Sequence, residues 1–147
     1  MALTFEAVRQ ALAPDEPNYE HVKELGAEAL PHLTKMIESQ DPHLAPKATW
    51  AAGLVGGVGT VNIAATTANS AVRAVAAAAT QHFLPQQASS ILEKLVDDKD
   101  DGVRKMALRH TPKGASRELL SKVEHIAKVT DDEYLRGLAR EALELNR

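Results

Sequence analysis

The sequence predicts an all-α fold, a short right-handed α-α superhelix of about five stacked antiparallel helical hairpins. Three observations carry this prediction. Apolar residues recur at steps of three and four along nearly the whole chain, prolines fall between the periodic segments, and one residue pattern returns about every 30 positions.

Helical spacing is clear where Leu30, Leu33 and Ile37 follow one another, and it returns in the later segments. No segment shows the two-residue alternation that is typical of a half-buried strand. Prolines separate the periodic segments, where they begin or end a helix without breaking one: Pro14, Pro17, Pro42, Pro85 and Pro112. Aromatic residues make up only 3% of the chain, so aliphatic residues and alanine must fill the core.

The internal repeat consists of aligned rows of apolar residues. One row of anchors comprises Leu44, Val72, Val103 and Leu135. Four residues after each anchor stands an alanine, in the row Ala48, Ala76, Ala107 and Ala139. Upstream of the anchors run two further rows: Leu33, Val61, Leu92 and Val123, then Ile37, Ala65, Val96 and Ala127. Each unit therefore reads as a first helix, a short polar turn and a second helix whose small alanine allows close packing.

A polar turn precedes each anchor. The turns are Gln40-Asp41-Pro42, Asn69-Ser70, Asp100-Asp101-Gly102 and Thr130-Asp131-Asp132. The last one continues to Glu133, which predicts a capping box between Thr130 and Glu133.

These rows predict a single domain over residues 1–147. Residues 3–26 supply a degenerate capping hairpin, and the repeat units span 27–56, 57–84, 85–112 and 115–147. One hairpin cannot bury its own apolar face, so neighbouring units must stack.

The segments 41–48, 69–76, 100–107 and 131–139 resemble the HEAT-repeat family. The resemblance covers about residues 27–147 and implies an armadillo-like solenoid that works as a protein-binding scaffold. It further implies that second helices line a concave surface and that turn aspartates and the following arginines link adjacent repeats. The residues at those positions are Asp100, Asp131, Arg73, Arg104 and Arg136.

The favoured function is a non-catalytic module that binds a protein partner through this concave face. Six residues after the anchors the units place Trp50, Ala78, Arg109 and Glu141. Tryptophan and arginine dominate binding energy when a partner buries them. The predicted partner-binding residues are Trp50, Arg73, Arg104, Lys105, Arg109 and Glu141. For Trp50, the only tryptophan, packing against a neighbouring repeat is the alternative.

Arg73 is the only residue of fixed charge in residues 48–92, between Lys47 and Glu93. Since an exposed helix normally carries charge on its outer face, this segment also suggests a homo-oligomer or self-assembling structural protein. A neutral, wet surface is the alternative. The glycines of 53–60 predict a loose turn rather than a phosphate loop. Glu16, Glu20, Glu24 and Glu28 predict an acidic stripe on one helix.

No catalytic, metal or cofactor site is predicted. There is no cysteine, and no two histidines lie three or four residues apart. A net charge of −3 does not favour a nucleic acid partner. The enzyme alternatives are a fold like the alkylpurine DNA glycosylases, with Trp50, Arg109 and Glu141 at the site, or a HEAT-like bilin lyase subunit. No signal segment or membrane span is visible, so the expected location is cytoplasmic.

Overall fold

The computed structural model describes residues 2–147, and that part of the chain is all-α. It contains ten α-helices and two short 3₁₀ helices, and none of the described residues forms a strand. The predicted fold class is therefore confirmed at the level of secondary structure.

The α-helices, in chain order, are α1 (Phe5–Leu12), α2 (Tyr19–Glu24), α3 (Leu30–Glu38), α4 (Leu44–Leu54), α5 (Val58–Ala64), α6 (Ser70–Ala79), α7 (Pro85–Leu95), α8 (Asp101–Arg109), α9 (Arg117–Val129) and α10 (Glu133–Leu145). The 3₁₀ helices are η1 (Gly26–Ala29) and η2 (Thr80–His82).

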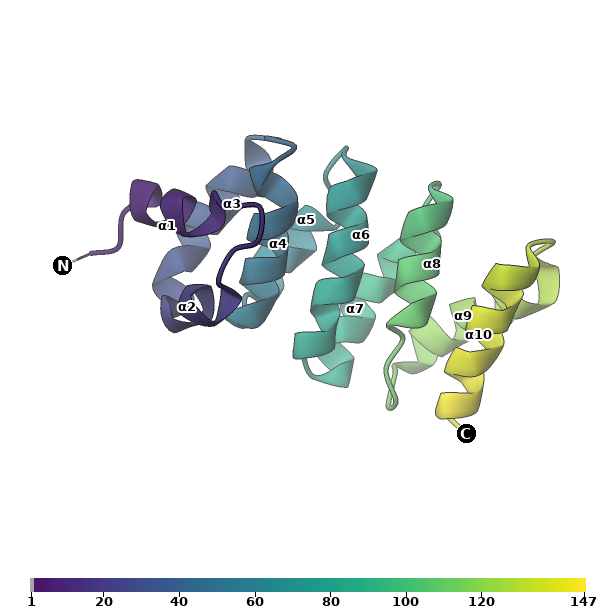
Figure 1. The fold of residues 1–147 in the computed structure, drawn as a ribbon. Helices are drawn as coiled ribbons and strands as arrows, with labels where there is room; N and C mark the ends of the chain where they lie inside the picture. Colours follow the sequence, from purple (N-terminus) through teal and green to yellow (C-terminus); the bar gives the residue numbers. More distant parts are fainter. Residues whose placement is uncertain (1) are drawn as a thin grey trace.

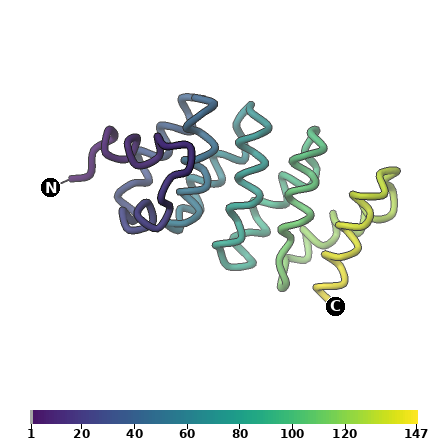
Figure 2. Tube along the Cα trace, in the orientation of Figure 1, coloured from purple at the N-terminus to yellow at the C-terminus, as the bar shows by residue number. Residues whose placement is uncertain are grey.

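From α3 onward the helices alternate between two layers. The helices α4, α6, α8 and α10 lie side by side in chain order, each in contact with the next (Figure 1). The helices α3, α5, α7 and α9 make up the other layer, and the path of the chain between the layers is easiest to follow in Figure 2. The first hairpin, α1 and α2, packs on α3 and α4 at one end.

The core is built from the aligned rows of small and aliphatic residues. All four alanines of the second-helix row, Ala48, Ala76, Ala107 and Ala139, are fully buried. So is the first-helix row Leu33, Val61, Leu92 and Val123. Because alanine adds one carbon beyond the backbone, α4 and α6 approach closely. The prediction that these rows face the core is confirmed.

Polar side chains cap the second helices at the predicted turns. The side chain of Asn69 accepts from the backbone N–H groups of Ala71 and Val72, and that of Asp100 accepts from the N–H of Val103. The predicted capping box at Thr130 is wrong: α10 is capped by Asp132, whose carboxylate accepts from Tyr134 and Leu135 at 2.8 and 3.1 Å. An aspartate directly before the helix reaches the two free N–H groups, and this shifts the helix start by two residues.

Two expectations about the turns need correction. The predicted acidic stripe is wrong, because α2 ends at Glu24 and Gly26 adopts a φ of 68°, which only glycine adopts readily. The turn predicted over 53–60 is shorter: α4 runs through Leu54, α5 starts at Val58, and Gly56 takes the positive φ of 80°.

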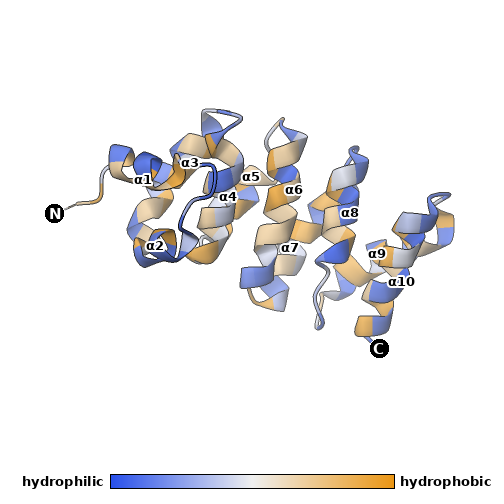
Figure 3. Cartoon of the chain, viewed as in Figure 1, coloured by the Kyte–Doolittle hydropathy of each residue, from blue (hydrophilic) through white to orange (hydrophobic). Residues whose placement is uncertain are grey.

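The layer of second helices, α4, α6, α8 and α10, changes in polarity along the chain. In Figure 3, α4 and α6 are largely apolar, whereas α8 and α10 carry hydrophilic residues on the viewed face. In the described residues no helix combines the length and apolar character that crossing a membrane requires.

Candidate functional site

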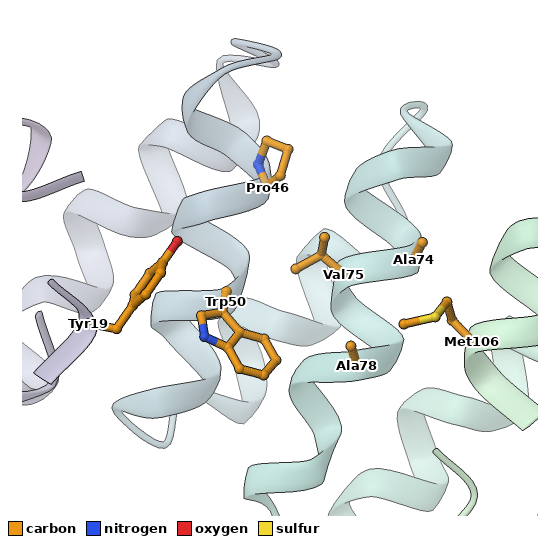
Figure 4. A pocket seen from close by; sticks show the side chains of 7 residues that line it. All are labelled: Tyr19, Pro46, Trp50, Ala74, Val75, Ala78 and Met106. Carbon is orange, nitrogen blue, oxygen red and sulfur yellow. The ribbon is translucent and has the colours of Figure 1, made fainter. Parts of the chain in front are cut away.

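An open apolar depression of about 390 Å³ lies on the face of the second helices. We call it the Trp50 depression; it is lined by Tyr19, Pro46, Trp50, Ala74, Val75, Ala78 and Met106. These residues come from α2, α4, α6 and α8. In Figure 4 the floor is the α6 segment with Ala74 and Ala78, and the side chains of Trp50 and Met106 rise on opposite sides of it.

The depression arises from the register of the repeat. Two and six positions after the anchor, α4 carries Pro46 and Trp50, whereas α6 carries Ala74 and Ala78 at the same two positions. Large side chains on one helix next to small ones on its neighbour leave a hollow above the smaller helix. The hollow remains accessible because all four of these residues are half-buried rather than packed into the core.

Trp50 is half-buried: it packs against His82 of the neighbouring repeat, as the second interpretation of the sequence expected, and the rest of its ring stays accessible. Its ring makes a T-shaped contact with the ring of His82, with centroids 4.9 Å apart and planes at 69°. The rest of the indole borders the Trp50 depression. The contact with His82 restricts the orientation of the ring.

His82 makes the environment of Trp50 sensitive to pH. Removal of water from its ring, together with the nearby charge of Lys23, lowers the pKa of His82 below its ordinary value of 6.5. The neutral ring is therefore retained to lower pH in the folded protein than in the unfolded chain, and its contribution to stability is lost as the pH falls through the folded pKa.

We expect the fluorescence of Trp50 to change as His82 becomes protonated, with a midpoint below pH 6.5. A fluorescence titration from pH 8 to about 4, within which His titration falls, checks this. The transition should vanish in His82→Gln and persist in His125→Gln, whose histidine is exposed on α9. A transition that survives His82→Gln would assign the pH response to another group.

A pair of cations lies beside the depression on α8. The ammonium of Lys105 stands 5.3 Å from the centre of the Tyr134 ring, and the guanidinium of Arg109 donates to the Tyr134 hydroxyl. Arg109 also approaches the sulfur of Met106 at 3.9 Å. Tyr134 of α10, half exposed, thus holds both cations next to the apolar wall that Met106 forms.

Arg109 and Glu141 line a second depression of about 260 Å³ between α8 and α10, together with the apolar residues Leu108, Leu138 and Leu145. The structure therefore brings two of the predicted site residues together. Trp50 borders the other depression, so Trp50 and Glu141 do not converge on one pocket as the glycosylase-like alternative requires.

The prediction that Arg73 contacts a partner is wrong. Its side chain is only 8% exposed and its guanidinium forms a two-point ion pair with Asp98, with N–O distances of 2.8 and 3.0 Å. It also donates to the carbonyl oxygens of Thr67 and Ala68. Burial opposes ionisation of Asp98, but the hydrogen bonds from Arg73 and from the N–H of Asp100 lower its pKa overall.

The three arginines that follow the anchors share one structural role. Each donates to a backbone carbonyl six residues earlier: Arg73 to Thr67, Arg104 to Asp98 and Arg136 to Thr130. Each one therefore ties the start of a second helix to the turn of its own unit. Arg104 also pairs with Asp101, so it serves the turn and is not among the residues that line the Trp50 depression.

The link between adjacent units uses a residue that the sequence reasoning did not select. The resemblance pointed to the turn aspartates Asp100 and Asp131, but Asp100 caps α8, and Asp98, two residues earlier, forms the ion pair with Arg73. Tyr19, Met106 and Tyr134 were also missed. Register could have found Met106, which lies three positions after its anchor, but Tyr19 lies in the irregular hairpin and has no register.

Comparisons with known proteins show the fold and no family. No protein-family model matches the chain, and no curated protein matches it. Among solved structures, the chain is similar to the crystal structure of an engineered protein from the Northeast Structural Genomics Consortium, with 21% identity and a TM-score of 0.62. The similarity covers 96% of this chain and 72% of the other.

Proposed function

We propose that this chain is a HEAT-like solenoid that binds a protein partner through the face of its second helices. The succession of α4, α6, α8 and α10 and the recurring arginine-to-turn hydrogen bonds support the solenoid description. The single observation that carries the binding function is the Trp50 depression, an accessible apolar hollow to which four helices contribute.

The residue types in the depression suit protein recognition. Trp50 is a large side chain held in place by His82, and Met106 adapts easily to different apolar partners. The apolar area is bordered by Lys105 and Arg109, which gives a polar rim beside an apolar centre. In the proposed function the chain carries out no chemistry of its own and requires no cofactor.

The test is affinity capture from the native lysate with four baits: the natural chain, Trp50→Ala, Ala78→Glu and the control Ser90→Glu. Ser90 is exposed on α7, in the opposite layer, so the control adds the same charge away from the depression. We expect specific partners to be retained by the natural chain and by Ser90→Glu, and lost at least about tenfold from the other two baits, since a buried anchor contributes 2 kcal/mol or more.

Equal recovery on all four baits would place the binding surface elsewhere. Circular dichroism of each bait shows whether it is folded, so that a loss of binding is not a loss of structure. Ala78 is half-buried on a helix and its side chain points into the hollow, so glutamate there is expected to be tolerated by the fold.

Self-association through residues 48–92 is the competing proposal. The structure explains part of the missing charge, because Ala48, Ala52, Ala76 and Ala77 are buried among neighbouring helices and do not face water. Light scattering after size exclusion decides the matter: a strict monomer at high concentration removes self-association.

A further inference from the structure

We infer that the Trp50 depression receives an amphipathic α-helix whose apolar stripe is flanked by acidic residues. This inference rests on the proposed function and names the chemistry of the partner. Three observations support it: the size of the hollow, the lack of free backbone N–H and C=O groups that could pair with an extended chain, and the positive charge of the residues beside it.

The hollow has room for the side chains of one helix face. Adjacent packed helices have axes about 8–10 Å apart, so the axes of α4 and α8, which flank α6, are roughly 16–20 Å apart. Because each of these helices occupies about 5–6 Å of that distance, a partner helix of about 10–12 Å diameter lies on the face and inserts its side chains between them. The floor of the hollow consists of Ala74 and Ala78, which let a partner approach α6 closely between the walls of Trp50 and Met106 (Figure 4).

The wall offers no backbone pairing to an extended chain. The lining residues of α4, α6 and α8 lie within helices, whose backbone N–H and C=O groups are bonded internally. A strand seated there would lose water from its own backbone groups without replacement, at a cost for each group. A helix satisfies its backbone internally, so it can bury apolar side chains in the hollow without that cost.

The helices that line the hollow carry more positive than negative charge, although acids of the last hairpin lie near both cations of α8: Lys105 helps to lower the pKa of Asp132, and Glu141 lines the second depression with Arg109. Neither α4 nor α6 contains an acidic residue, and the only acidic residue of α8, Asp101, is paired with Arg104. The same helix presents Lys105 and Arg109, which are one turn apart and are both held by Tyr134.

The other side of the hollow carries one further cation. On α2, Lys23 lies one turn after Tyr19, close enough to His82 to lower its pKa. Glu20 and Glu24 lie one and five positions after Tyr19, which at about 100° per residue places them on other faces of α2. Glu141 belongs to α10, beyond α8 as seen from α6.

A helix in the hollow therefore meets Lys105 and Arg109 along one flank. Because these two cations are spaced four residues apart, they match two carboxylates that are spaced four residues apart on the partner. Opposite charges across the rim accelerate association and fix the register of the bound helix, while the buried apolar residues supply most of the affinity.

The experiment is a selection from a displayed library of helical peptides. Every peptide carries the same leucine stripe at positions i, i+3, i+4 and i+7, and the flanking positions hold an equal mixture of Glu, Gln and Lys. These three residues have similar helix propensities, so selection reports charge and not helicity. The baits are the natural chain and the double variant Lys105→Glu/Arg109→Glu.

We expect Glu to be enriched at least about tenfold over Lys on one flank of peptides selected by the natural chain, and the preference to reverse on the double variant. Selected peptides should change the fluorescence of Trp50 saturably, and their affinity should fall as salt rises. Binding to Ala78→Glu should be lost, while Ser90→Glu should bind as the natural chain does.

Enrichment of Gln or Lys on the natural chain, or the same Glu preference on both baits, overturns the inference. If such peptides still require Trp50 and Ala78, the proposed function stands and only the acidic character of the partner is wrong. If the selected peptides bind equally to Ala78→Glu, or if no peptide is enriched, the hollow does not receive a helix. In that case the lysate capture decides the proposed function separately.

Discussion

Replacing Arg73 with leucine will lower the free energy of unfolding by about 3–5 kcal/mol, because it leaves Asp98 as an unpaired, largely buried carboxylate. The two side chains are 8% and 9% exposed in the natural protein. The substitution also removes the hydrogen bonds to the carbonyl oxygens of Thr67 and Ala68. Urea unfolding followed by circular dichroism measures the change.

Two further variants separate the ion pair from loss of the arginine itself. Arg9→Leu breaks an exposed pair, with side chains 38% and 61% exposed, and should leave the free energy of unfolding nearly unchanged. The double variant Arg73→Leu/Asp98→Leu removes both charges and should recover part of the loss. If Arg73→Leu lowers the free energy of unfolding no more than Arg9→Leu does, the ion pair between Arg73 and Asp98 does not stabilise the fold.

The same pair predicts how stability depends on pH. Since the pKa of Asp98 is lowered in the folded protein, its contribution is fully present above the ordinary value of 3.8 and is lost as the pH falls through the folded pKa. We expect this loss at acid pH in the natural chain and its absence when Asp98 is replaced.

The second large effect is a difference in sign between two glycine-to-alanine substitutions within helices. Gly53→Ala should destabilise the protein by about 1–3 kcal/mol, because overpacking outweighs the gain in helix propensity. A Cβ at Gly53 would lie 2.9 Å from the Cβ and 3.0 Å from the backbone oxygen of Ala79. Gly137→Ala, on the exposed face of α10, meets no atom within 4 Å and should stabilise by about 0.5–1 kcal/mol.

Thermal and urea unfolding of both variants, measured in parallel, test this contrast. Backbone propensity alone predicts stabilisation at both positions, so an increase in stability for Gly53→Ala would show that α4 and α6 can move apart. Because repeat units depend on their neighbours, the loss at Gly53 should also lower cooperativity between the units on either side.

Periodicity alone was sufficient to predict the all-α class and the rows that enter the core. The helical pattern is local, and burial follows it because one face of each helix must leave water. The errors occurred at the ends of helices. Thr130 and Asp132 are both competent caps, and only the three-dimensional path of the turn selects Asp132.

Part of the candidate site was also legible in the sequence. Register placed Trp50, Ala78 and Arg109 at one repeat position, and the structure puts all three on depressions of the second-helix face. It could not show that Tyr19 joins them, because the first hairpin carries no repeat pattern. Nor could it show that Arg73 pairs with Asp98, because the resemblance pointed to the turn aspartates Asp100 and Asp131 instead.

What the sequence by itself determined is the all-α class, the repeat and the core rows, because these depend on spacing along the chain. Only the tertiary structure decided which polar side chains are buried in contacts within the fold and which stay exposed on its surface. The reason is physical: Arg73 and Arg109 are chemically identical, but one lies beside Asp98 of the next unit and the other beside the exposed Tyr134. Their roles depend on contacts that link residues 25 positions apart in the chain.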